Sequence, residues 1–211
     1  MRLGKIEDYN MRSVIAICLA VVGCLVSAAC LSTRPVHYYT LEAPAAPANQ
    51  SRLDGPILLV GSIATPEALQ DGRIRYRAGS NEAGAYEYHR WAERPGSMVR
   101  DALMRALRSS GKYQRVLEAA SSTNGDYLLR GKLDEFDEVD KGSIETKISL
   151  RLELLDRKTN QNIWDRTVER EEPVSGKSVV DVVQSLDRNL QHVVSEIAGE
   201  IDTFLAARHG T

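Results

Sequence analysis

The chain has 211 residues, of which 43% are hydrophobic and 27% are charged. This length and composition are typical of one globular domain preceded by a leader, and the formal net charge of −2 argues against an electrostatic nucleic-acid binder. All three cysteines, Cys18, Cys24 and Cys30, lie within residues 1–30, which excludes a disulfide or a Cys-rich zinc site in the rest of the chain.

An uncharged apolar segment, VIAICLAVVGCLVSAA, runs from Val14 to Ala29 and follows Arg12. A short basic region, an apolar core and then small residues form the pattern of a signal peptide, which we expect over residues 1–29, with Met11 as an alternative start. Two other interpretations fit the same residues. Val14–Leu31 is just long enough for an uncleaved transmembrane anchor, and cleavage after Ala29 would release a secreted protein.

The residues Ser27-Ala28-Ala29-Cys30 resemble a bacterial lipobox, in which small residues precede a cysteine that receives a lipid. A serine replaces the usual leucine three positions before the cysteine. Cys24, at the end of VVGC, is a second candidate, but it would shorten the apolar core. We expect Cys30 to be the lipidated residue. The residue after it is Leu31 and not an aspartate, which by analogy with lipoprotein sorting in enterobacteria indicates the outer membrane.

Residues 30–55 are expected to form the anchor and a tether. His37–Leu41 (HYYTL) is β-prone and predicts an edge strand at the root of the tether. Residues 42–55 are rich in alanine, proline and small polar residues, which is typical of a linker. The folded domain is expected over residues 56–208.

Apolar patterning predicts the strands of this domain. Their expected ranges are 56–63, 73–77, 85–91, 113–117, 127–139, 143–156 and 163–170. The clearest signal lies between Ile144 and Leu154, where mostly apolar side chains alternate with Glu, Lys, Ser and Arg. Such alternation indicates a sheet with one covered face and one wet face.

Two helices are predicted from apolar residues at helical spacing. The first begins near Pro95, which the first turn tolerates, and ends at Gly111. The second begins at Ser178, with Asp181 three positions on as a weak capping box, and continues to about Ala207. Together the patterns predict a single α/β domain, with a mixed or antiparallel sheet and about two helices packed on one face.

The sequence contains no P-loop, GxSxG, HExxH or GxGxxG following a strand. The four histidines, His37, His89, His192 and His209, are scattered, and His192 is expected at the surface. The acidic run Asp134–Asp140 lacks the spacing of a calcium loop, and we interpret it as a solvated strand end that discourages edge pairing. We therefore expect no catalytic residue, no cofactor and no metal, and a protein that is not an enzyme.

Candidate interface residues come from segments in which aromatic and charged side chains alternate. Tyr, Trp and Arg tend to carry binding energy at interfaces. The candidates are Tyr38, Tyr39, Tyr86, Tyr88, Arg90 and Trp91. Arg73, Arg75 and Arg77 form a basic stripe on one face of a predicted strand, which is either a solvated face or a docking surface for an acidic partner.

The lipobox-like cysteine, YYTL at Tyr38–Leu41, the strand ILLVGSI, and YHRW from Tyr88 with Pro95 beyond it occur in this order before the C-terminal amphipathic helix. From about Cys30 to Ala207 the chain thereby resembles the ABC-type transport auxiliary lipoproteins, the PqiC-like accessory lipoproteins of MCE transport systems. The resemblance implies an outer-membrane lipoprotein that faces the periplasm. It would work with an MCE-domain protein and, through it, with an inner-membrane ABC permease and ATPase.

Such systems move lipids or related hydrophobic molecules between membranes and support envelope integrity, and the lipoprotein itself would not hydrolyse ATP. The resemblance also implies a domain related in shape to the TolB N-terminal domain and, in some members, assembly into homo-oligomeric rings. Two other functions remain open. One is an outer-membrane assembly or structural lipoprotein without an ABC transporter, and the other is a carrier that binds lipid in an apolar pocket of its own.

Overall fold

The computed structural model describes residues 34–42, 53–79, 81–120 and 124–209. The chain divides into two units, residues 1–36 and residues 37–211, and only residues 34–36 of the first unit are described. The expected signal peptide, Cys24, Cys30 and most of the expected linker lie outside the described residues.

Within its described residues the second unit forms one mixed sheet of eight strands. The strands are β1 (His37–Tyr39), β2 (Ile57–Ala64), β3 (Arg73–Ala78), β4 (Glu82–Trp91), β5 (Arg115–Glu118), β6 (Tyr127–Asp140), β7 (Ile144–Asp156) and β8 (Gln161–Pro173). The helices are α2 (Pro95–Ser109), α3 (Val179–His209) and the short 3₁₀ helix η1 (Glu67–Leu69). The predicted α/β domain with a mixed sheet is confirmed. The differences are local: β5 starts two residues late, β8 continues to Pro173, and η1 had no signal in the apolar pattern.

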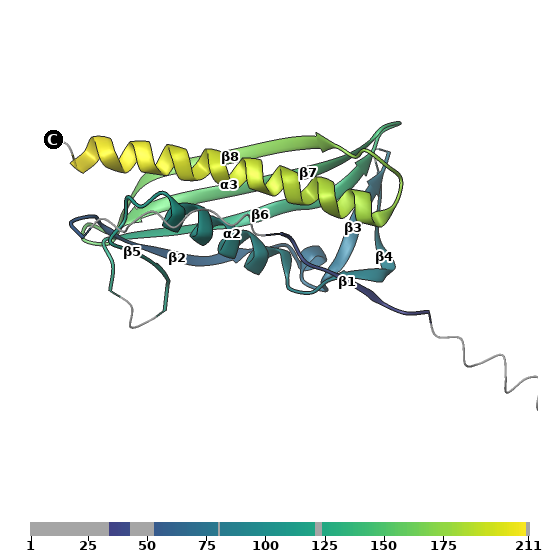
Figure 1. Ribbon diagram of the computed structural model, residues 1–211, viewed down its shortest axis with the longest axis horizontal. Coiled ribbons are helices and arrows are strands. Elements are labelled where there is room, and N and C mark those ends of the chain that lie inside the picture. Colours follow the sequence, from purple (N-terminus) through teal and green to yellow (C-terminus); the bar gives the residue numbers. More distant parts are fainter. Residues whose placement is uncertain (1–33, 43–52, 80, 121–123, 210–211) are drawn as a thin grey trace, which may run out of the picture. The chain divides into compact units, whose positions relative to one another are not determined.

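Strand β6 is the centre of the sheet. On one side β7 pairs with it in antiparallel fashion along its whole length, from Tyr127↔Asp156 to Asp140↔Ile144. On the other side two strands share it, because β2 pairs with its first half and β3 with its second half, both in parallel. The sheet therefore branches at β6: β5 lies beyond β2, while β4 and then β1 lie beyond β3 (Figure 1).

Helices α2 and α3 cover one face of this sheet (Figure 1). The alternation predicted for β7 holds, because Ile148, Leu150, Leu152 and Leu154 are all fully buried on the helix side. The α3 side chains at helical spacing that meet them include Leu186, Val193, Ile197 and Ile201, which are also fully buried. Burial of each such side chain contributes about 1.5–3 kcal/mol, so this stripe supplies much of the stability of the domain.

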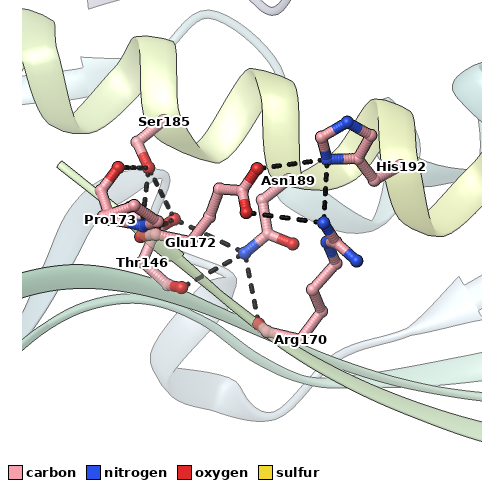
Figure 2. Close-up of polar contacts among 7 residues, drawn as sticks. All are labelled: Thr146, Arg170, Glu172, Pro173, Ser185, Asn189 and His192. Carbon is pink, nitrogen blue, oxygen red and sulfur yellow. Dashed lines mark hydrogen bonds and ion pairs between the residues drawn. The ribbon is translucent and has the colours of Figure 1, made fainter. Parts of the chain in front are cut away.

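A buried polar network also joins α3 to the sheet (Figure 2). The side-chain amide of Asn189 donates to the main-chain carbonyls of Thr146 at 3.1 Å and Arg170 at 3.2 Å. The Ser185 hydroxyl lies 3.0 Å from that of Thr146 and donates to the Pro173 carbonyl at 3.1 Å. These contacts determine which turn of α3 lies over the β7–β8 ladder, a choice that apolar packing alone leaves open.

The solvent side of the network is ionic. His192 is more than half exposed, as expected, and its Nδ1 lies 3.1 Å from the Glu172 carboxylate and 3.2 Å from the Arg170 guanidinium (Figure 2). The Ser185 hydroxyl contacts main-chain carbonyls and Thr146, and no contact joins it to His192 within the described residues. Ser185 and His192 thus each connect α3 to the β7–β8 ladder, the serine from inside the protein and the histidine from the solvent side.

We predict that Asn189→Ala lowers the free energy of unfolding by about 2–3 kcal/mol, because two carbonyls inside the protein lose their amide donor. Urea denaturation followed by circular dichroism measures the change. The matched control is Glu196→Ala on the exposed side of α3, where only a surface ion pair with Arg166 is lost and the expected change is below about 1 kcal/mol. Equal losses for the two variants would contradict a specific role for the network.

Candidate functional site

A bulge in β4 positions the candidate site. Arg73 of β3 is opposite Arg90, but Arg75, two residues on, is opposite Ala85, so two steps along β3 correspond to five along β4. The extra residues lie in the segment YEYH, where aromatic and charged side chains alternate. A bulge re-aims side chains. As a result Tyr86 and His89 both contact a cluster of rings on the helix side, although strict alternation would separate them.

Aromatic rings on the helix side join the edge strand β1 to β4. His37 stacks on His89 with ring centroids 5.2 Å apart. The Tyr39 hydroxyl lies 2.9 Å from Nδ1 of His89, and Tyr86 meets the same imidazole edge-on at 5.8 Å. Tyr76 of β3 extends the cluster, with its ring centroid 5.3 Å from that of Tyr86. A three-residue strand is too short to hold its place by ladder hydrogen bonds alone, so these rings secure β1 to the domain.

The cluster is anchored to the central strand through Glu138. The Tyr86 hydroxyl donates to its carboxylate at 2.7 Å. Burial raises the pKa of Tyr86, and the bond to Glu138 raises it further. Burial also raises the pKa of Glu138, which the hydrogen bond from Tyr86 partly offsets. The pair therefore keeps the phenol protonated and links β4 directly to β6.

The acidic run Asp134–Asp140 is not a solvated strand end, so that interpretation is wrong. β6 is paired on both sides here, with β3 and β7, and Asp137 and Glu138 are 3% and 7% exposed. Local sequence could not reveal this, because the partners come from distant segments. Buried carboxylates need cations or donors, and β3 and β4 supply them.

The opposite face of the sheet carries the basic stripe. Because Ile74 is fully buried, Arg73, Arg75 and Arg77 point to this face. Each meets a carboxylate of the chain itself. Arg73 pairs with Asp71 at 2.6 Å, Arg75 lies 3.8 Å from Asp137, and Arg77 donates to Asp137 at 2.8 Å and meets Glu135 at 3.1 Å. The bond to Asp137 raises the pKa of Arg77, and the stripe is largely neutralised within the domain.

The structure divides the candidate interface residues between the two faces. Tyr38 is opposite Arg90 in the parallel β1–β4 pair, and alternation places Tyr88 with them on the face of the basic stripe. We call this surface, made of Tyr38, Tyr88, Arg90 and the stripe, the outer patch. Tyr38 is its most exposed aromatic residue, at 67%. Tyr39 and Tyr86 lie on the helix side, partly buried against the core.

Trp91 corrects the expectation most clearly. It is 3% exposed, its ring packs against Phe136 with centroids 5.5 Å apart, and it belongs to the core. The expected role as an interface residue does not fit this position. Sequence reasoning also missed His37, His89 and Glu138. A signal existed, because HYY and YHRW each place a histidine beside tyrosines, but nothing local shows that the two segments pair in parallel.

A groove of about 350 Å³ lies between α2 and α3. Alanines of α2, Ala102 and Ala106, face Leu190 and Val194 of α3 there, and small side chains leave the space open. Glu42, Asp187 and Asp202 also line it, and burial raises the pKa of Asp187. The groove thus combines apolar side chains of both helices with three carboxylates.

Comparison with known proteins identifies the family. A family model described as ABC-type transport auxiliary lipoprotein component matches residues 39–198. The chain belongs to this family. The resemblance drawn from the sequence is thus confirmed, and the match includes every strand except the first two residues of β1, together with α2 and two thirds of α3. The family is an auxiliary component of transport, not an enzyme family. No curated protein sequence matched this auxiliary lipoprotein.

Solved structures share the fold. Protein XCC0632 from Xanthomonas campestris is 22% identical with a TM-score of 0.70, over 84% of this chain and 100% of that one. A second structure, of an uncharacterized protein, is 21% identical with a TM-score of 0.63, over 80% and 99% of the two chains. The hypothetical protein CT253 from Chlamydia trachomatis is 9% identical with a TM-score of 0.51, over 72% and 99%. At these identities the likeness shows the fold alone.

Membrane spans and metal sites are absent from the part of the chain that the structure describes. No helix in the described ranges is both long enough and apolar enough to span a bilayer. In the same ranges no group of three or more His, Cys, Asp or Glu side chains could hold a metal ion. The segment Val14–Leu31, the alternative transmembrane anchor, lies outside these ranges.

We predict that β1 of the auxiliary lipoprotein loosens at acid pH. Burial, and then the neighbouring His37, lower the pKa of His89 below its ordinary value of 6.5. The unfolded or detached segment therefore binds a proton more readily than the folded one, so the attachment is complete above about pH 6.5 and weakens as pH falls through the lowered pKa. Protection of the Ala92 amide, which donates to the Tyr39 carbonyl at 2.8 Å, should therefore fall as the pH is lowered, so that its exchange approaches the intrinsic rate at that pH.

The control is His89→Phe, which keeps an aromatic ring but cannot titrate. In this variant the exchange rate of the Ala92 amide, divided by its intrinsic rate, should depend less on pH than in the parent protein. If the parent and the variant respond to acid alike, His89 is not the group that governs the attachment.

Proposed function

We propose that this chain is a non-enzymatic outer-membrane accessory subunit of an MCE/ABC-type system that transports lipids or other hydrophobic molecules. In this proposal it faces the periplasm and docks the periplasmic MCE-domain protein, and through it the inner-membrane permease and ATPase, to the outer membrane. Envelope integrity would depend on that connection. Membership of a family of auxiliary transport lipoproteins supports the proposal.

The attachment to the membrane is proposed at Cys30, with Cys24 as the less favoured position. The apolar run that ends in SAAC supports this choice, since Cys30 is preceded by small residues and by a longer apolar core than Cys24. A lipid-modified cysteine with several acyl chains anchors firmly, because each buried CH₂ contributes about 0.8 kcal/mol and a single chain is only marginal.

The observation that carries a docking function is the outer patch itself. It presents Tyr88 and Tyr38 on the face of the basic stripe, whose arginines are already balanced by carboxylates of the same domain. A pre-paired arginine is held in one orientation, so less side-chain entropy is lost when a partner binds. Aromatic residues next to oriented arginines have the composition of an interface hot spot. We propose the part of the patch around Tyr88, Arg75 and Arg77 as the contact with the MCE protein.

We predict that Cys30→Ser abolishes incorporation of labelled palmitate and releases the chain from the membrane fraction, because no thiol remains at the lipobox-like site. The matched control is Cys24→Ser, which should keep both the label and the membrane retention. Cell fractionation and autoradiography measure the two outcomes. Unchanged labelling of Cys30→Ser would reject the assignment of the anchor.

We predict that Tyr88→Ala weakens co-purification with the cognate MCE-domain protein by about tenfold or more in apparent affinity, as expected for removal of a central aromatic contact. Pull-down with purified soluble domains measures the loss, and circular dichroism checks that the fold is intact. Glu196→Ala on α3 serves as the matched surface control and should bind like the parent.

Absence of any association between the parent chain and the MCE protein, with the lipid anchor intact, would instead favour an assembly or structural lipoprotein. Association that Tyr88→Ala leaves unchanged would move the docking surface away from the outer patch without rejecting the partner.

A further inference from the structure

Exposed apolar surface gathers where the chain enters the domain. In the described residues four large hydrophobic side chains are exposed, namely Val36, Tyr38, Leu53 and Val180. Two of the four, Val36 and Tyr38, are neighbours two positions apart at the start of β1, and Tyr38 is 67% exposed. A tyrosine this open on an edge strand leaves most of its side-chain surface in contact with solvent.

Two arginines at and just beyond the end of β4, Arg90 and Arg94, have no carboxylate partner within the described residues. Arg90, opposite Tyr38 in the β1–β4 pair, donates only to the main-chain carbonyl of Asp71 at 3.2 Å. Arg94 is exposed and follows Ala92, whose amide binds the Tyr39 carbonyl. No ion pair involves Arg90 or Arg94 within the described residues, whereas Arg73, Arg75 and Arg77 all have one. The carboxylates nearby in sequence are Asp71, paired with Arg73, and the exposed Glu87 and Glu93.

The length of the tether limits how far this part of the domain can lie from the membrane. His37 lies seven positions after Cys30, and at no more than about 3.5 Å per position this stretch reaches at most about 25 Å. The register places Tyr38 opposite Arg90 and Arg90 opposite Arg73, two residues before the Arg75↔Asp137 pair, whereas the start of β2 is opposite Tyr127. About eight residues of β6, or about 26 Å, therefore separate the two positions along the strands. Because β1 is parallel to β4 and β4 is antiparallel to β3, the chain enters β1 from the end of the domain that lies away from the start of β2. A lipid on Cys30 therefore keeps β1 nearer to the leaflet than the start of β2.

We infer that the tether corner, defined as Tyr38, Arg90 and Arg94, rests on the lipid headgroups of the leaflet that holds Cys30. The inference rests on the proposed anchor at Cys30 and adds the face that the domain turns toward the membrane. Tyr38 lies at the interface, where an amphipathic ring keeps its hydroxyl wet and its apolar body in the headgroup layer. Arg90 and Arg94 bind lipid phosphates, which suit the planar guanidinium.

The contact orients the domain relative to the membrane. Binding at the β1–β4 corner adds to the anchor a second, weaker attachment, which limits rotation about the flexible tether. Arg75 and Arg77 then lie close to the membrane surface but one strand further into the sheet, on β3, while Tyr88 lies on β4 at the border of the contact, two residues before Arg90. A partner that reaches this region is thereby brought next to the leaflet.

The test uses the lipidated full chain in vesicles of phosphatidylcholine and phosphatidylglycerol that contain brominated acyl chains. Tyr38→Trp places a reporter at the corner, and its exposure makes the substitution tolerable. Leu53→Trp is the matched control, because Leu53 is 87% exposed and precedes β2 at the other end of the domain. The emission of each added tryptophan is measured by subtracting that of the parent, which contains two.

We expect the emission at position 38 to shift to shorter wavelength and to be largely quenched, and the emission at position 53 to be unaffected. Adding Arg90→Gln and Arg94→Gln to Tyr38→Trp should restore much of the emission. If the protein floats with the vesicles but position 38 is quenched no more than position 53, the inference is overturned while the anchor stands.

Two other outcomes are distinguishable. Failure of the chain to float with the vesicles would overturn the proposed anchor at Cys30, and with it the basis of the inference. A shift at position 38 that appears only after addition of the MCE-domain protein, and not with vesicles alone, would assign the corner to a protein interface and overturn the membrane contact.

Discussion

The architecture depends on how the two edges of β6 are used. One edge is taken entirely by β7, so the antiparallel ladder from β6 to β8 forms a continuous, twisted surface for α3 to cover. The other edge is divided between β2 and β3, and this division creates two branches. One branch ends in β5. The other continues through β4 to β1, so the way in which the central strand is shared decides where the first strand of the domain lies.

The branch toward β1 is held by polar and aromatic contacts more than by the main core. Asp137 and Glu138 are buried at the second half of β6, and each is matched by a residue of the branch, Arg77 of β3 and Tyr86 of β4. Breaking either pair would leave a buried carboxylate without its partner, which is costly inside a protein. The acidic run is therefore the link between the central strand and the strands that carry the outer patch.

The bulge in β4 connects this framework with function. It gives the helix side Tyr86 and His89, which secure β1, and it leaves Tyr88 and Arg90 on the opposite face. One short segment thus contributes both to the attachment of the edge strand and to the surface offered to other molecules. In the proposed arrangement, with a lipid on Cys30, a firm attachment of the first strand would matter, because the anchor would connect to the domain through it.

The sequence by itself determined the elements and the main core. The alternation in β7 and the helical spacing in α3 predict which side chains are buried. The hydrophobic effect favours their burial whichever residues they pack against, so these side chains can be predicted without knowing their contacts in the fold. The order of motifs also identified the family. Only the tertiary structure decided the branching at β6, the burial of Asp137 and Trp91, and the meeting of Tyr39 with His89, which are fifty residues apart. Such contacts depend on which strands pair and in what register, and a local pattern carries no signal for a partner that lies far along the chain.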